Sequence, residues 1–419
     1  MTIFREDWFD PTRPKKEKTA AQREREHQEK VKEAVRYAKR IETLELCCKW
    51  FVPIVSTIAA VAVFVSVIAT SGTQVSEGIP RAAVIVLEGF KGTVFDELLA
   101  NNKLPNIQYL AAQGVRAECS SLSDSSCART QSGQLLGSQY LWTSGPGLAS
   151  ILSGVNADKH QVANDTFTGY SSYSVTSATY PSMLAWAKSS GLSTQVIGAS
   201  HLITSLATKG GSCSLLGVAD FECGTDASGR CLQSSTCNTD IRVTTLPNND
   251  FQGTEENTYY ADIAKAFDTT TFDSDLVVLH LNKLARLAED ASYPNCYYSS
   301  DSVDYTAVAY VLDSVVGQLV QTITNRVTDQ RENWLIILTS DHGGLGKSSG
   351  TNTDDDEVIP FVLATLTTSG NLVLNSLQLP TTQMDVAPTV MSWFGVNMTT
   401  AVDGKVQSIC STGLNPTDC

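Results

Sequence analysis

The longest run of apolar residues in the chain is Trp50–Thr70, with the sequence WFVPIVSTIAAVAVFVSVIAT. Its 21 residues include no charged side chain, and roughly 20 apolar residues are enough for a helix to cross a bilayer. A buried core helix is the alternative interpretation, and a cleaved signal peptide fits less well because the run starts far from Met1. We therefore predict a transmembrane helix at residues 50–70.

Beyond residue 81, short apolar runs alternate with segments of helical periodicity. Ala82–Leu87 is apolar throughout, as expected of a strand that is buried on both faces. Further strands are expected at 194–197, 276–281, 334–338 and 359–364, and helices at 104–113, 146–152, 180–189, 259–267, 303–324 and 384–394. This alternation predicts an α/β fold with a central, mostly parallel sheet flanked by helices. The Ser/Gly/Cys-rich residues 204–240 interrupt it and are interpreted as a disulfide-braced insertion.

Charge is unevenly divided between the two sides of the predicted span. Residues 1–49 carry 13 Lys/Arg and 10 Asp/Glu, a net charge of +3, and leave 17 of the 30 basic and 34 of the 44 acidic residues to the rest of the chain. Basic residues remain on the cytoplasmic side of a membrane helix. The sequence therefore predicts a single-pass protein with a cytoplasmic N-terminus. Its net charge of −14 disfavours nucleic acid as a partner.

Four segments follow from this topology. Residues 1–49 form a cytoplasmic charged segment that includes a helix, and the transmembrane helix occupies 50–70. Residues 71–81 are a linker, and 82–419 form a large domain outside the cell or in the lumen of the secretory pathway.

Nine of the 11 cysteines lie beyond the predicted span, which suits an oxidising compartment. Short spacing favours pairs among eight of them and leaves Cys296 unpaired, although spacing does not determine connectivity. The candidates are Cys119 with Cys127, pairs within Cys213, Cys223, Cys231 and Cys237, and Cys410 with Cys419. Two sequons, at Asn164 and Asn397, are candidate glycosylation sites on the same side of the membrane.

Acidic residues directly follow two of the predicted strands. Glu88 comes after the first strand, and Asp341-His342-Gly343-Gly344 comes after the strand at 334–338. In open α/β sheets, functional groups collect at the carboxyl ends of strands. An Asp-His pair offers one oxygen and one nitrogen ligand to a zinc-like ion. The two glycines are expected to let the backbone turn and approach a ligand closely.

Ser144 is the candidate nucleophile. It precedes Pro146, a residue suited to the first turn of a helix, so Ser144 is expected beside a helix N-terminus, which attracts anions. A bound metal could activate its hydroxyl. A simple N-cap is the alternative interpretation, because serine is common at that position.

Taken together, the ordered segments resemble the alkaline-phosphatase superfamily, and within it the type I phosphodiesterases and nucleotide pyrophosphatases. The resemblance covers most of residues 82–396. After the strand that ends in Glu88-Gly89, the segments that carry it are LPNIQYLAAQGV (104–115), SGPGLASILSGVNADKH (144–160), DLVVLHL (275–281), TSDHGG (339–344), IPFVLA (359–364) and TTQMDVAPTVMSWFGV (381–396). The resemblance implies phosphoester hydrolysis with two zinc-like ions beside a Ser or Thr nucleophile.

Position by position, the resemblance implies that one ion is held by Glu88, Ser144, Asp341 and His342. The family has Asp at position 88, so Glu moves the carboxylate by about 1.5 Å. At the second-ion positions this chain has Ala285, Glu289 and Ser349, none of which matches the ligands of the family. Asp165 replaces an Asn that donates to the phosphate, and a carboxylate would repel that anion. His280 and His160 are expected to be non-ligand core residues.

These substitutions leave three interpretations open. The first is a membrane-anchored, degenerate and non-catalytic domain that serves as a binding or assembly subunit, with one zinc or other divalent cation or none. The second is an active hydrolase that uses Ser144 and one remaining metal position, in which Glu289, Asp290 or the acidic residues 354–357 could hold a hard cation. The third is a subunit of a larger protein assembly. We favour the first, because the missing ligands lower the transition-state stabilisation that a second ion supplies.

Overall fold

The computed structural model describes nine stretches of the chain: residues 78–119, 121–130, 134–135, 139–140, 142–163, 179–198, 241–245, 273–368 and 377–407. The chain divides into a unit of residues 1–76 and a unit of residues 77–419, and the described residues all belong to the second. The predicted cytoplasmic segment and the transmembrane helix at 50–70 lie outside the described residues. So do the insertion at 204–240 and the helix expected at 259–267.

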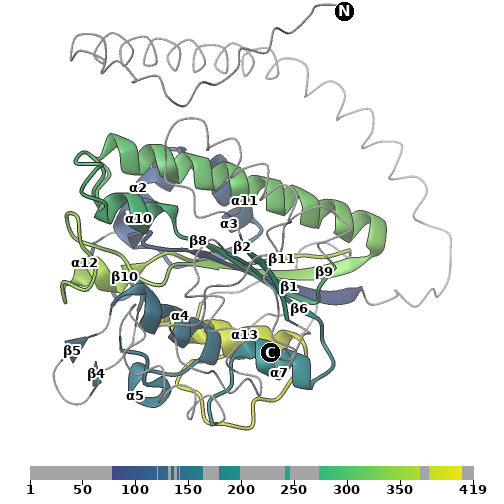
Figure 1. Cartoon of the computed structure of the whole chain (residues 1–419). Coiled ribbons are helices and arrows are strands. Elements are labelled where there is room, and N and C mark those ends of the chain that lie inside the picture. The colour runs from purple at the N-terminus through teal and green to yellow at the C-terminus, as the bar shows by residue number, and fades with distance from the viewer. Residues whose placement is uncertain are drawn as a thin grey trace, which may run out of the picture. The chain divides into compact units, whose positions relative to one another are not determined.

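In the described part of the chain, seven strands form one mixed sheet in the order β2-β11-β9-β1-β8-β6-β7 (Figure 1). The strands are β1 (Ile79–Leu87), β2 (Gly114–Arg116), β6 (Thr194–Gly198), β7 (Ile241–Thr245), β8 (Leu276–Leu281), β9 (Glu332–Thr339) and β11 (Phe361–Leu366). Neighbours from β9 to β7 are parallel, whereas β11 is antiparallel to both β9 and β2. The carboxyl ends of β9, β1 and β8 therefore meet at one edge of the sheet. The short pairs β3 (Ala128–Arg129) with β10 (Val358–Ile359) and β4 (Gln134–Leu135) with β5 (Gln139–Tyr140) lie outside this sheet.

The central strand β1 is apolar throughout because helices cover both faces of the sheet. Its alternate residues Ala83, Ile85 and Leu87 belong to one buried cluster, and Ala82, Val84 and Val86 belong to another. Side chains alternate between faces along a strand, so a strand buried on both sides needs apolar residues at every position.

Two helical layers supply the covering (Figure 1). One face carries α2 (Gly92–Ala100), α3 (Pro105–Ala112), α10 (Lys283–Glu289) and α11 (Val303–Gln330). The other carries α4 (Ser144–Ser153), α7 (Met183–Ser189) and α13 (Val386–Trp393), with the short α5 (Ala157–His160) beside them. The expected mixture of a sheet and flanking helices is therefore confirmed.

Element boundaries differ from the predictions mainly at three places. The strand expected at 359–364 is divided by Pro360 into β10 and β11, because proline lacks the N–H that a continuous ladder needs. The helix expected at 384–394 is the 3-10 turn Gln383–Asp385 followed by α13. The helix expected at 303–324 continues to Gln330 and ends at Arg331, which has a left-handed backbone with φ of 55°.

Among the described residues, α11 alone has the length and apolar composition that could cross a membrane. Half of its apolar window is buried within the domain. Residues along its buried side, including Leu312, Val316 and Leu319, belong to the buried cluster between the sheet and the helical layer that contains α11. This burial is typical of a core helix, and it leaves the prediction of a span at 50–70 untested.

The described cysteines agree with the sequence analysis. Cys119 and Cys127 form a disulfide, as predicted. Cys296 is buried and unpaired, also as predicted. The other candidate pairs, from Cys213 to Cys237 and Cys410 with Cys419, lie outside the described residues.

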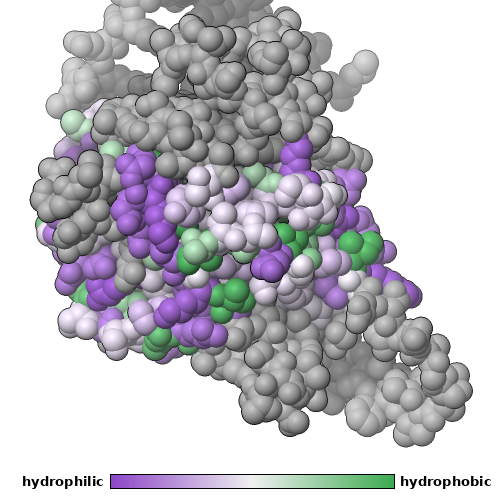
Figure 2. Space-filling view, turned by 90° about the horizontal axis from the view of Figure 1, so that it is seen from below, coloured by the Kyte–Doolittle hydropathy of each residue, from purple (hydrophilic) through white to green (hydrophobic). Residues whose placement is uncertain are grey.

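The face seen in Figure 2 has apolar side chains scattered among polar ones over its described part. Scattered apolar residues are normal on a protein surface, whereas a docking interface is usually a contiguous patch. The predicted role in a larger assembly therefore stays a prediction.

Candidate functional site

The candidate site lies where β1, β9 and the start of α4 meet. Glu88 directly follows β1, and Asp341 and His342 lie just beyond the end of β9. β1 and β9 are neighbouring parallel strands, with Val86 opposite Thr339. The structure therefore brings together the four residues predicted to surround the first ion, which are Glu88, Ser144, Asp341 and His342.

Ser144 is the first residue of α4 and is only 7% exposed. Its hydroxyl oxygen lies 3.0 Å from Oε1 of Glu88 and 3.0 Å from Nε2 of His342. The residue at the N-cap position is Thr143, which makes no capping bond through its side chain. The N-cap interpretation of Ser144 is therefore wrong, and its hydroxyl belongs to the polar site.

Two glycines bring α4 and β1 close to Asp341. Gly89 has φ of 73°, a left-handed conformation that favours glycine, and its N–H donates a hydrogen bond of 3.1 Å to Oδ1 of Asp341. On α4, a Cβ at Gly147 would clash with the carbonyl oxygen of Asp341. Both contacts fix the position of the Asp341 carboxylate.

The glycines of the Asp-His-Gly-Gly motif have a packing role in the described part of the chain. Their N–H groups donate to the protein backbone, from Gly343 to the carbonyl of Asp356 at 2.7 Å and from Gly344 to that of Asp355 at 2.9 Å. A Cβ on Gly344 would clash with the ring of Tyr298. These glycines allow close packing of neighbouring segments, and the predicted approach to a ligand stays a prediction.

Asp341 is fully buried and only partly satisfied. Oδ1 accepts from the N–H groups of Gly89 and His342, at 3.1 and 3.0 Å, but Oδ2 has no hydrogen-bond partner. Burial raises the pKa of Asp341 to about 6; the nearby His342 opposes this rise and Glu88 adds to it. A buried oxygen without a donor is costly, and a cation would satisfy it.

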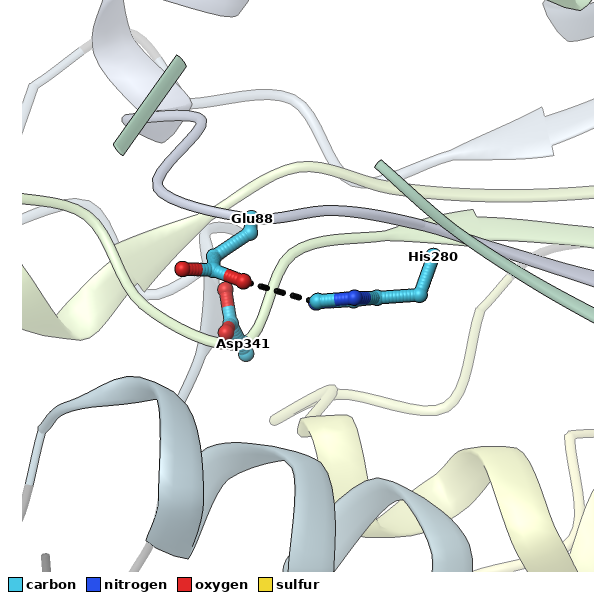
Figure 3. Close-up of side chains that lie close together, drawn as sticks. All are labelled: Glu88, His280 and Asp341. Carbon is cyan, nitrogen blue, oxygen red and sulfur yellow. Dashed lines mark ion pairs between the residues drawn. The ribbon is translucent and has the colours of Figure 1, made fainter. Parts of the chain in front are cut away.

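His280 lies in the site, although the sequence analysis treated it as a packed core residue. It is fully buried near the end of β8, and its Nε2 lies 2.9 Å from Oε2 of Glu88. Figure 3 shows the two side chains pointing toward one another, with Asp341 beside Glu88. The expectation was wrong because a histidine in an apolar strand carries no sequence signal of its partner. Parallel pairing of β8 with β1, with His280 opposite Val86, places it there.

The histidines and Ser144 keep Glu88 ionised. Burial acts to raise the pKa of Glu88, but the interactions with His280, His342 and the Ser144 hydroxyl outweigh it and leave the pKa below its ordinary value. For His342, burial acts to lower the pKa, yet three nearby carboxylates, of which Asp341 is the strongest, outweigh it and raise the pKa to about 9. Nδ1 of His342 lies 2.6 Å from the carbonyl oxygen of Gly343. Because a carbonyl only accepts, Nδ1 carries the proton.

The donor set fits one divalent cation. Glu88, His280 and Asp341 each offer a ligand atom, and these atoms lie within 4.8 Å of one another. Oδ2 of Asp341 and Nδ1 of His280 are buried without a hydrogen-bond partner, and Oε2 of Glu88 contacts Nε2 of His280 at 2.9 Å. Buried polar atoms in native proteins are rarely left unpaired, so their convergence supports an ion at this place.

The three second-ion positions offer no such set. Ala285 is buried, and its Cβ lies 2.7 Å from the point where a Cβ on Gly89 would stand. The carboxylate of Glu289 accepts a hydrogen bond of 2.9 Å from the hydroxyl of Tyr298. Ser349 is half-buried on the loop that follows β9.

The acidic residues 354–357, considered above as possible ligands of a hard cation, are mostly engaged in contacts with the protein. They form the one-turn helix α12 (Asp354–Glu357), whose capping box joins Thr353 and the buried Asp356. Lys91 pairs with Asp355, and Arg129 pairs with Glu357 at 2.7 Å. Its backbone carbonyls also accept hydrogen bonds from the N–H groups of Gly343 and Gly344, so this helix supports the Asp-His-Gly-Gly motif.

The remaining candidates lie away from the centre or outside the described residues. Asn164 and Asp165 belong to the latter, so their predicted roles stay predictions. Asn397 is exposed beyond the end of α13, as a glycosylation site requires.

Comparisons with known proteins identify one family and several solved structures. The sequence model of the sulfatase family matches residues 104–396. A phosphonate monoester hydrolase of Agrobacterium radiobacter is 13% identical, with a TM-score of 0.50, and the match covers 78% of this chain and 76% of that chain. An alkaline-phosphatase-superfamily protein of Vibrio parahaemolyticus is 14% identical, with a TM-score of 0.46 and 78% and 70% covered. The zinc complex of the C-terminal periplasmic domain of EptC from Escherichia coli is 13% identical, with a TM-score of 0.42 and 79% and 88% covered. No curated protein matches the chain.

Proposed function

The chain belongs to the sulfatase family, and from this membership and the geometry around Ser144 we propose that its domain binds a phosphate or sulfate ester together with one divalent cation, without turning the ester over at an enzymatic rate. In this proposal the span at 50–70 anchors the domain to a membrane, where it serves as the binding part of a larger assembly. The observation that carries the proposal is that Glu88, Ser144, Asp341 and His342 lie together, while the positions of Ala285, Glu289 and Ser349 hold no second group of ligands.

The intact part of the site supports ester binding. Ser144 begins α4, and the N-terminus of a helix attracts anions. The Ser144 hydroxyl is held between Glu88 and His342, at 3.0 Å from each, so its orientation is fixed before a ligand arrives. Preorganised polar groups bind a ligand at a lower entropic cost.

Binding of an anion at this place requires a cation. Glu88 is ionised beside Ser144, and a carboxylate repels an ester oxyanion. A divalent ion would neutralise the two carboxylates and polarise an ester oxygen. Glu88 and Asp341 would hold it, and His342 would keep the hydroxyl of Ser144 directed at the ester.

Slow or absent turnover follows from the second-ion positions. Ala285 has no donor, and the Glu289 carboxylate is engaged by Tyr298. A metal ion supplies several kcal/mol of charge stabilisation in the transition state. Since each 1.36 kcal/mol is tenfold in rate, its loss would slow hydrolysis by roughly 10²–10⁴-fold.

A second candidate function is hydrolysis with one ion and Ser144 as the nucleophile. The observation that favours it is the short contact of Ser144 Oγ with Nε2 of His342. His342, whose pKa is raised to about 9, would donate to the Ser144 oxygen at this distance, and the ionised Glu88, which accepts from the hydroxyl at 3.0 Å, could take its proton. The same residues would then act on an ester rather than only hold it.

One experiment separates the two functions. Full-length protein is loaded with Zn²⁺ and tested for binding of inorganic phosphate and sulfate by calorimetry, and for hydrolysis of nitrophenyl phosphodiester, phosphomonoester and sulfate. We expect anion binding that depends on Zn²⁺ and hydrolysis no faster than that of Ser144→Ala. Hydrolysis that Ser144→Ala abolishes would establish the second candidate, and absence of any anion binding would exclude the first.

A further inference from the structure

Two histidines approach Glu88 from different elements and make different contacts. His280 comes from β8 and faces Oε2 at 2.9 Å, whereas His342 reaches Ser144, which in turn bonds Oε1. We propose that the cation is held by Glu88, His280 and Asp341, and that His342 positions Ser144 instead of ligating the ion. This inference rests on the proposed one-ion site and names its ligands and the class of metal.

Convergence of the ligand atoms supports this set. Among the described residues, Glu88, His280 and Asp341 are the only group of three or more His, Cys, Asp or Glu side chains whose ligand atoms all lie within 4.8 Å of one another. His342 is outside this group, although its Nε2 lies 3.8 Å from Oδ2 of Asp341. An ion bonded to both Glu88 and Asp341 thus has His280 as its nearest common nitrogen ligand.

The contacts of the two histidine rings also favour His280 as the metal ligand. Nε2 of His280 contacts Oε2 of Glu88, a proposed ligand of the same ion, at 2.9 Å, and Nδ1 of this fully buried ring has no hydrogen-bond partner. Both ring nitrogens of His342 have one, the carbonyl oxygen of Gly343 at 2.6 Å and Ser144 Oγ at 3.0 Å. Coordination of an ion would give the His280 ring a partner, whereas coordination by Nε2 of His342 would break the contact of His342 with Ser144.

The backbone of this cluster is well fixed. His280 and Glu88 come from the neighbouring parallel strands β8 and β1, and the N–H of Glu88 donates to the carbonyl of Leu281 at 3.0 Å. Ligand atoms around a zinc ion stand about 3.5 Å apart, given metal–ligand distances of about 2.0–2.2 Å. The side chains of Glu88 and His280 therefore need to separate by only about half an ångström to admit an ion.

The donor set also selects the metal. Two carboxylates and one imidazole suit Zn²⁺ or Mn²⁺, whereas Mg²⁺ and Ca²⁺ take oxygen ligands almost exclusively. Three protein ligands leave an open position for an oxygen of the ester. We therefore expect Zn²⁺ to bind far more tightly than Ca²⁺ or Mg²⁺.

The test measures Zn²⁺ affinity and stoichiometry by calorimetry on chelator-treated full-length protein, without any ester. We expect one ion per chain. Removal of a residue that merely orients a ligand changes metal affinity by roughly 10–100-fold, so His280→Leu should weaken binding by more than about 100-fold. His342→Leu should change it by less than about tenfold. His160→Leu is the matched control, because His160 is also fully buried and lies outside the cluster.

Circular dichroism establishes that each variant is folded. His280→Gln and His342→Gln form a second matched pair that keeps a polar side chain at each position, and the visible absorption of bound Co²⁺ reports loss of a nitrogen ligand. A spectrum that changes in His342→Gln but not in His280→Gln would overturn the assignment, as would a wild-type chain that binds no ion. Failure of the proposed function is distinguishable, since the ion would still bind through His280 while phosphate and sulfate would not bind.

Discussion

The hydroxyl of Tyr298 donates a hydrogen bond of 2.9 Å to Oε1 of Glu289. Glu289 is the last residue of α10, and Tyr298 is buried against Gly344 with its ring 6.5 Å from that of His342. This bond connects the segment that follows α10 to the Asp-His-Gly-Gly motif. It also engages the carboxylate that stands at one of the second-ion positions.

Substitution of Tyr298 by Phe should lower the free energy of unfolding by about 1 kcal/mol, because one hydrogen bond is lost while the buried ring is kept. Chemical denaturation of the full-length chain measures it. Tyr109→Phe is the control, since Tyr109 is 49% exposed, and its effect should stay within about 0.5 kcal/mol. An equal effect of both substitutions would show that the bond contributes nothing.

His160 should make the stability of the domain depend on pH. Burial is the main cause that lowers its pKa from 6.5 to about 3. Nδ1 accepts from the N–H of Val162 at 3.0 Å, so Nε2 carries the proton and faces Ser150 Oγ at 3.1 Å. Between these two pKa values the unfolded chain binds a proton that the folded chain does not. The free energy of unfolding should therefore rise with pH from about 3 to 6.5, by up to about 1.4 kcal/mol per unit, and gain nothing more from His160 above that.

Comparison with His160→Gln isolates this contribution. Asp96 has the opposite effect, because burial raises its pKa from 3.8 to about 6, so the folded chain binds more protons there and stability falls as pH rises through that window. The difference between wild type and His160→Gln removes the Asp96 contribution. A difference that does not change between pH 4.5 and 7 would contradict the assignment of a neutral, buried His160.

Glu332 should be among the most sensitive positions for stability. Its carboxylate accepts from Arg326 at 2.6 and 2.7 Å, from Arg81 at 3.1 Å and from Trp334 Nε1 at 2.9 Å. Both Glu332 and Arg326 are nearly fully buried. Breaking a buried pair costs about 3–5 kcal/mol, because the remaining charge is unpaired.

Glu332→Gln should therefore lower the midpoint of chemical denaturation sharply. Glu118→Gln is the control, since Glu118 pairs with Arg116 at 3.3 Å but is 75% exposed, and exposed pairs contribute about 0–1 kcal/mol. A small loss in Glu332→Gln would mean that water or other groups replace the missing charge.

Much of the fold could be predicted from local sequence. The apolar run at 82–87 and the run at 276–281 are strands, and Glu88 and Asp341 could be placed at one sheet edge because strands end there. Ser144 begins a helix, and only the family resemblance placed it beside them. His280 could not be placed, since its role depends on the register between β8 and β1 rather than on its neighbours in sequence. The support of the Asp-His-Gly-Gly motif by α12 depends in the same way on tertiary packing.

The predicted topology is tested by protease protection. Trp50–Thr70 is uncharged, and basic residues precede it, so residues 71–419 should be resistant to protease added to the cytoplasmic side of sealed vesicles. Residues 1–49 should be digested. Detergent should expose the protected fragment, which is the control that the vesicles were sealed. Digestion of the large domain without detergent would mean that the orientation is the reverse of the predicted one or that residues 50–70 do not span the membrane.

Restoration of the missing second-ion ligands should fail, because packing has closed their place. Ala285 is 2% exposed and lies against Gly89, and its N–H donates to the carbonyl of Glu88 at 3.2 Å. Inserting extra atoms into a packed core costs about 1–3 kcal/mol, and burying a carboxylate adds to this. The double variant Ala285→Asp with Glu289→His should therefore be less stable by more than about 2 kcal/mol and should bind no additional Zn²⁺. The single variant Glu289→His, on the exposed end of α10, should lose only about 1 kcal/mol, the contribution of its hydrogen bond with Tyr298. A gain of one ion per chain in the double variant would show that the site is still open and that only its ligands were lost.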